Sequence, residues 1–140
     1  MRWKGLAALL FIASVGSAAA HTGGTIGFAT ITVDGASVRY SLALGPALLP
    51  TQLAEQMRLS EPGAAPHYQP LLDAVAQHLR ISGDGRACEA GPGQVTPPAG
   101  ERTNLLVVIP FTCETPPREL SIRDDLVDVL GSDYHTLANI

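Results

Sequence analysis

The hydrophobic pattern of the chain centres on an apolar run from Thr103 to Cys113. The run consists mostly of aliphatic, β-branched and aromatic residues, it is too short for a helix of useful length, and turn-rich segments containing proline flank it. These features predict a strand that is buried on both faces. Because Pro110 has no amide hydrogen, we expect the pairing on one side of this strand to lapse or bulge shortly before Cys113.

A β-hairpin is predicted earlier in the chain. Residues 25–33 and 37–44 flank Asp34-Gly35, a dipeptide typical of two-residue turns with positive φ. Apolar and polar residues alternate in the second segment, which indicates one buried and one solvent-facing side. The cross-strand pairs expected from this turn are Ile31 with Val38 and Ala29 with Tyr40.

Apolar residues recur at helical spacing in the middle of the chain. A short helix is predicted from Thr51, with Thr51 capping the first turn and Leu53 and Met57 on the apolar side. A second helix is predicted from about Pro70, a residue suited to the first helical position, to the segment Gly83-Asp84-Gly85. Its expected apolar stripe comprises Leu71, Leu72, Val75, Ala76 and Leu79.

Two further strands are predicted after the rigid segment Thr115-Pro116-Pro117. Residues 119–123 alternate, with Leu120 and Ile122 expected inward, and residues 134–140 form another strand-like run. This last run stops without a turn or a polar tail, which suggests that the domain is truncated at its C-terminus. The whole pattern predicts a mainly β, antiparallel, sandwich-like domain with two short inserted helices.

The first twenty residues have the pattern of a secretory signal peptide. Arg2 and Lys4 precede an apolar core at residues 6–15, and a tail of small residues follows that fits the A-x-A cleavage rule. The apolar core is shorter than the about 20 residues that span a bilayer, which argues against a membrane anchor. We therefore predict a signal peptide at residues 1–20 and a single exported, periplasmic or extracytoplasmic domain at residues 21–140.

The exported part is acidic. The whole chain carries 9 basic and 13 acidic residues, so loss of Arg2 and Lys4 leaves 7 against 13, a net charge of −6. This balance argues against a nucleic-acid partner, because few cations remain to neutralise phosphates. The remaining arginines are scattered and predict no patch for an anionic membrane.

The two cysteines of the chain, Cys88 and Cys113, are expected to form a disulfide in an oxidising compartment. Their Cα atoms should lie about 4.4 to 6.8 Å apart. In the chain-entropy model the bond should stabilise the domain by roughly 3 to 4 kcal/mol. A metal or catalytic role is the minor alternative, because the chain has no C-x-x-C spacing.

Histidine and aspartate offer the one specific chemistry that the sequence suggests, a metal site. If cleavage follows Ala20, an N-terminal His21 would present its amine and ring nitrogen to one ion. Asp133-Tyr134-His135 would add a carboxylate and an imidazole from one side of an extended chain. Such ligands suit Cu(II) or Ni(II), and periplasmic copper proteins of the CopC type use a similar first histidine and Asp-x-His. Alternatively, Asp133 caps a turn after Gly131 and His135 is an ordinary strand residue.

Patterns of hydrolytic enzymes are missing from the sequence. There is no G-x-S-x-G motif, and the adjacent Asp124 and Asp125 should point to opposite faces of a strand. These aspartates, with Asp128 and Asp133, could gather Ca²⁺ only if the loop folded back, so a solvated acidic edge is the simpler interpretation. A catalytic function, such as that of a secreted enzyme, is therefore the least favoured class.

The segments HLRISGDGRAC, PFTCETPPREL and IRDDLVDVLGSDYHTLANI follow a signal peptide and a hairpin. In this order they resemble the exported N-terminal region of HupE/UreJ-type membrane proteins, a family associated with hydrogenase and urease accessory roles and proposed nickel or cobalt transport. The resemblance implies a non-catalytic extracytoplasmic module that assists metal handling. Its partner would be a membrane-embedded domain C-terminal to this segment or another membrane protein. The alternative is a soluble periplasmic copper- or nickel-binding carrier.

Overall fold

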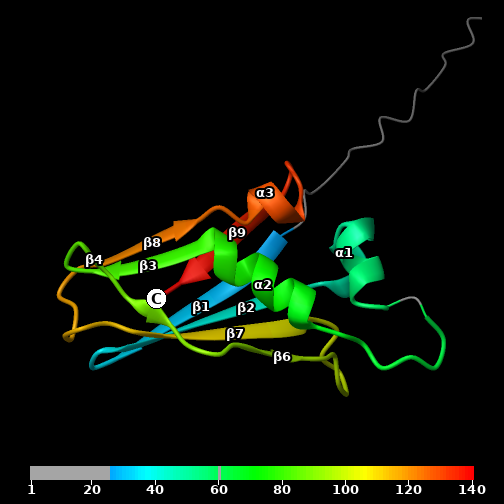
Figure 1. Cartoon of the computed structure of the whole chain (residues 1–140), viewed down its shortest axis with the longest axis horizontal. Coiled ribbons are helices and arrows are strands. Elements are labelled where there is room, and N and C mark those ends of the chain that lie inside the picture. Colours follow the sequence, from blue (N-terminus) through cyan, green and yellow to red (C-terminus); the bar gives the residue numbers. More distant parts are fainter. Residues whose placement is uncertain (1–25, 60) are drawn as a thin grey trace, which may run out of the picture.

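The computed structural model describes residues 26–59 and 61–140, which form two β-sheets and several short helices (Figure 1). The larger sheet contains, in spatial order, β5 (Glu89–Ala90), β7 (Leu105–Thr112), β2 (Ser37–Leu44), β1 (Ile26–Asp34) and β9 (His135–Asn139), with β6 (Gln94–Thr96) also paired to β7. The smaller sheet contains β4 (Arg86–Ala87), β3 (Leu79–Gly83) and β8 (Leu120–Asp124). The helices are η1 (Pro46–Leu48), α1 (Thr51–Gln56), α2 (Gln69–His78) and α3 (Val127–Leu130).

The predicted mainly β, sandwich-like class is confirmed. The described strand pairs are antiparallel except for β1 and β9, which run parallel. The smaller sheet and α2 lie over the same side of the larger sheet (Figure 1), and the buried apolar side chains form one core. Its fully buried members include Tyr40, Leu42, Leu44, Met57, Leu71, Val75, Ile81, Leu105, Val107, Ile109 and Leu126.

The predicted hairpin is confirmed, but the predicted register is wrong by two residues. Ile31 lies opposite Tyr40 rather than Val38, and the loop is formed by Gly35 and Ala36. Gly35 has a φ of 57° at the first loop position, where a type II′ turn favours glycine. A shift of two residues keeps every side chain on its face, because the period of a strand is two. The predicted buried and exposed sides of β2 are therefore correct.

The strand β7 is buried on one face only, so the prediction of burial on both faces is wrong. Its inward residues Leu105, Val107, Ile109 and Phe111 are buried, whereas the alternate residues are half-buried or exposed. The reason is the layer arrangement, since the smaller sheet and α2 cover one side of the larger sheet.

The predicted lapse in pairing beside Pro110 is confirmed. On that side of β7, β6 pairs with residues 106–108 and β5 with residues 111–112. The ladder is interrupted between them, at the residue that has no amide hydrogen. The other side of β7 pairs with β2 along its whole length.

Both inserted helices are present, with corrected ends. In the described residues α1 has no side-chain cap at its first turn, so the predicted capping by Thr51 is wrong; Pro50 precedes the helix. The helix α2 ends at His78 instead of Gly83, and Leu79 begins β3. Asp84 and Gly85 have φ values of 50° and 79°, as a two-residue type I′ turn requires, and they join β3 to β4.

The C-terminal strands are also present. Leu120 and Ile122 are half-buried in β8, and β9 confirms the strand predicted near the end of the chain. The short helix α3 between them was not predicted, because four residues of mixed aspartate and aliphatic side chains show no helical period.

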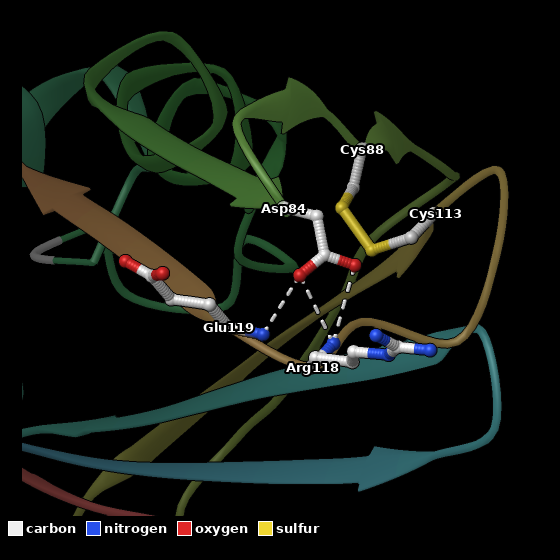
Figure 2. The surroundings of a disulfide bond; sticks show 5 residues. All are labelled: Asp84, Cys88, Cys113, Arg118 and Glu119. Carbon is white, nitrogen blue, oxygen red and sulfur yellow. Dashed lines mark hydrogen bonds between the residues drawn. A yellow bond between two sulfur atoms is a disulfide. The ribbon is translucent and has the colours of Figure 1, made fainter.

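The predicted disulfide between Cys88 and Cys113 is present, with Cα atoms 4.2 Å apart, slightly closer than expected. It connects the segment between β4 and β5 to the end of β7. Beside it, the Asp84 carboxylate accepts hydrogen bonds from the amides of Arg118 and Glu119, the latter at 2.9 Å (Figure 2). The β3–β4 turn, next to the disulfide, is thus tied to the chain that enters β8.

The predicted signal peptide at residues 1–20 and His21 lie outside the described residues. Within residues 26–59 and 61–140, each helix is too short or too polar to cross a bilayer.

Candidate functional site: a cleft between the two sheets

A cleft of about 520 Å³ lies between the β1–β9 side of the larger sheet and the segment formed by β8 and α3. This volume is in the range of small-molecule sites. The apolar residues of its lining are Ile31, Ile122, Val127, Ala138 and Ile140. The polar residues are Tyr40, Asp124, Ser132, Tyr134, His135 and Thr136. We call this feature the inter-sheet cleft.

Tyr40 and Asp124 join the two sheets at the cleft. Tyr40 comes from β2 in the middle of the larger sheet and is 1% exposed. Its hydroxyl donates a hydrogen bond to Asp124 Oδ2 at 3.1 Å. The amide of Leu126 donates to Asp124 Oδ1 at 3.0 Å. Hydrogen bonds to both oxygens therefore fix the carboxylate of Asp124. This residue is half-buried and lies at the end of β8.

Tyr134 is the second buried phenol of the cleft. The Thr136 hydroxyl donates to the Tyr134 hydroxyl at 2.9 Å. The ring ends against β1 at Gly27, where a Cβ atom would collide with the Tyr134 oxygen. Glycine at this position therefore makes room for the tyrosine.

The electrostatics of the cleft are those of neutral phenols beside one carboxylate. Burial raises the pKa of the Tyr40 hydroxyl well above its ordinary value, and the charge of Asp124 raises it further. Burial also raises the pKa of Tyr134, although the hydrogen bond from Thr136 opposes this shift. Both phenols therefore stay protonated at neutral pH. Among the described lining residues there is no lysine or arginine, so the cleft favours hydrogen-bond donors and cations over anions.

A second hollow, of about 600 Å³, lies among α1, α2 and α3. Most of its polar lining residues, such as Gln52, Asp73 and Asp128, are exposed side chains. The inter-sheet cleft is the stronger candidate, because four of its polar residues are buried or half-buried and are held by hydrogen bonds: Tyr40, Asp124, Tyr134 and Thr136.

Of the three residues predicted to bind a metal, the structure describes Asp133 and His135. His135 is exposed, begins β9 and lines the cleft. Asp133 lies in a turn in which the Tyr134 amide donates to the Gly131 carbonyl at 3.0 Å, so it does not share an extended strand with His135. Among the residues described here, no three His, Cys, Asp or Glu side chains gather as metal ligands. Because His21 is outside this part, the three-residue site stays a prediction.

Other polar residues differ from their predicted environments. Asp124 is bonded to Tyr40 rather than solvated, whereas Asp125 pairs with the exposed Arg123 at 2.7 Å. His78, at the end of α2, is half-buried, and its Nδ1 lies 2.8 Å from the Ala74 carbonyl oxygen.

The sequence pattern did not reveal the cluster of Tyr40, Asp124 and Tyr134. The alternation of β2 placed Tyr40 on the buried side, and a buried tyrosine usually has a hydrogen-bond partner. The need of a buried Tyr40 for a hydrogen-bond partner was the signal that the sequence offered for this cluster. It could not identify a partner 84 residues away in the chain.

Comparisons of the chain with protein-family models, with curated proteins and with solved structures found no match. The resemblance to HupE/UreJ-type proteins therefore remains a prediction from the sequence.

Proposed function

We propose that this chain is a non-catalytic binding module that works outside the cytoplasm in association with a HupE/UreJ-like membrane protein. The observation that supports binding is the inter-sheet cleft, which combines apolar walls with one fixed carboxylate. The Cys88–Cys113 disulfide is consistent with an oxidising compartment.

The chemistry of the cleft argues for binding rather than catalysis. General acid–base catalysis works best when the pKa of the group is near the working pH. The pKa values of Tyr40 and Tyr134 are shifted upward, away from neutrality. Both oxygens of the Asp124 carboxylate already accept hydrogen bonds, one from the Tyr40 hydroxyl and one from the Leu126 amide, which gives this group a structural role.

The ligand class that fits this cleft is a small organic cation with an apolar body. A carboxylate with two accepted hydrogen bonds still has free lone pairs for an ammonium group. The apolar walls would bury the hydrocarbon part of the ligand, and the nearby carboxylate would disfavour anions.

The test is a calorimetric titration of the protein with phenethylamine and with 2-phenylethanol, its neutral counterpart of similar shape. We expect the amine to bind at least tenfold more tightly, because a charge-assisted hydrogen bond contributes about 1.5 to 3 kcal/mol. Asp124→Asn should remove this preference, while its amide oxygen can still accept from the Leu126 amide and its NH2 group can donate to the Tyr40 hydroxyl. Asp128→Asn, on exposed α3, is the matched control and should change nothing. Equal affinities for the two probes, or an unchanged preference in Asp124→Asn, would contradict the proposed ligand class.

A metal carrier is the second candidate, and the parallel pairing of β1 with β9 favours it. Ile26 lies opposite His135 at the start of both strands. His21 precedes Ile26 by five residues, and five extended residues span up to about 17 Å. The mature N-terminus could therefore reach His135.

The metal prediction is tested by titrating Cu(II) and Ni(II) into protein that begins at His21. Binding should weaken at least tenfold in His21→Ala and in His135→Ala, because each removes a nitrogen ligand. His67→Ala removes an exposed loop histidine and should have no effect. Absence of binding, or binding that survives both substitutions, would exclude the carrier function. A reading frame that continues into several apolar spans would instead favour the membrane-associated module.

A further inference from the structure

Within residues 26–59 and 61–140, the strand β9 forms an uncovered edge of the larger sheet. It pairs with β1 on one side, and within the described residues no strand pairs with its other side. Four of its five residues are exposed. Proteins usually protect such an edge with charged residues, proline or a bulge. The sequence of β9, HTLAN, contains no proline and no Asp, Glu, Lys or Arg.

The opposite edge of the sheet is protected in these ways. It is built from the two short strands β5 and β6, and the chain between and after them contains Pro92, Pro97 and Pro98. The contrast indicates that the lack of protection is specific to β9.

An exposed apolar patch adjoins the β9 edge. Ile26, Phe28 and Leu137 are 38%, 53% and 55% exposed. Phe28 lies opposite Leu137 and Ile26 opposite His135, so the three apolar side chains share the outer face of the sheet. We call these three residues the β1–β9 patch. Exposed apolar side chains that gather in this way mark interaction surfaces.

We infer that a second copy of this chain pairs its β9 antiparallel to this β9 and extends the larger sheets into one. With Leu137 at the two-fold axis, His135 lies opposite Asn139 and Thr136 opposite Ala138 of the other copy. This register brings the two β1–β9 patches onto the same face as one apolar band. The contact is closed and self-complementary, as in the commonest class of oligomer.

Two acidic copies can meet at β9 because this strand carries no Asp, Glu, Lys or Arg, and the charge next to it favours the antiparallel orientation. The chain is acidic, and Asp133 lies just before β9. In the antiparallel register the two Asp133 residues are separated by eight positions along the strands, or about 27 Å. This is well beyond the Debye length of about 8 Å in physiological salt. A parallel pairing would place these carboxylates side by side.

The test measures the association of the mature chain by sedimentation over a range of concentrations. We expect a reversible dimer, and Leu137→Lys should raise its dissociation constant at least tenfold by placing like charges at the axis. Val33→Lys alters an exposed valine at the hairpin end of β1, and it should dimerise normally. A chain that stays monomeric at all concentrations, or a dimer unaffected by Leu137→Lys, would overturn the inference.

The register is tested by a cross-link. Leu137→Cys should form a covalent dimer on oxidation, because directly opposed residues of antiparallel strands lie about 4.5 to 5.5 Å apart and within disulfide range. Val33→Cys should stay largely uncoupled. A dimer that forms without this cross-link would overturn the proposed register. Neither experiment depends on the amine titration, so the dimer can fail while the ligand-binding proposal stands.

Discussion

Replacing both Cys88 and Cys113 by alanine is expected to lower the free energy of unfolding by about 3.5 kcal/mol. This value follows from the entropy of closing a loop whose ends are 25 residues apart. For a domain of this size it corresponds to a fall in Tm of roughly 10 to 20 °C. Urea unfolding of the variant and the unmodified protein, followed by circular dichroism, measures the difference.

The position of the disulfide explains why so large an effect is expected. Cys88 follows β4 of the smaller sheet and Cys113 follows β7 of the larger one, so the bond links the two layers. Dithiothreitol should destabilise the unmodified protein by a similar amount and leave the double-alanine variant unchanged. Equal stability of the two proteins without reductant would show that the fold does not depend on the cross-link.

Gly27→Ala is expected to destabilise the protein by about 1 to 3 kcal/mol, the usual cost of overpacking a filled core. The new methyl group would collide with the Tyr134 hydroxyl and would lie 3.0 Å from Leu42 Cδ1 and 3.1 Å from Leu44 Cδ2. Thermal and urea unfolding report the loss of stability. Gly91→Ala is the comparison and should cost less, because Gly91 is exposed and its added methyl would have one tight contact, with Pro110 Cγ at 3.2 Å.

A double-mutant cycle identifies the cause of this loss. Tyr134→Phe removes the oxygen that the alanine would strike, so Gly27→Ala should cost less in the Tyr134→Phe background than in the original chain. The relief should be partial, because the contacts with the two leucines remain. If the two substitutions were simply additive, Tyr134 would not be the residue for which Gly27 makes room.

Residue patterns with a short period were sufficient to predict the local elements. The alternation in residues 37–44 identified the buried side of β2, including Tyr40, although the turn lies one residue later than predicted and the register differs by two residues. A register shift of two residues leaves each side chain on its predicted face, because side chains alternate with a period of two. Proline positions likewise predicted the start of α2 and the lapse in pairing beside Pro110.

Patterns along the chain were a poorer guide where a residue's environment depends on distant segments. The apolar run around Val107 and Val108 gave no sign that Val107 is fully buried and Val108 is not, since that depends on which side the smaller sheet covers. The end of α2 at His78 was missed for a similar reason. Leu79 fits a helical stripe, but pairing of β3 with β8 draws it into a strand.

The sequence by itself determined the five strands β1, β2, β7, β8 and β9, the two inserted helices and the pair of cysteines, because each depends on neighbouring residues or on residue type alone. Only the tertiary structure decided that β9 lies parallel to β1 and that Tyr40 meets Asp124. These contacts join segments about 80 to 110 residues apart, and their free energy comes from packing and hydrogen bonds that no local pattern encodes. The inter-sheet cleft and the uncovered β9 edge both arise from this long-range assembly.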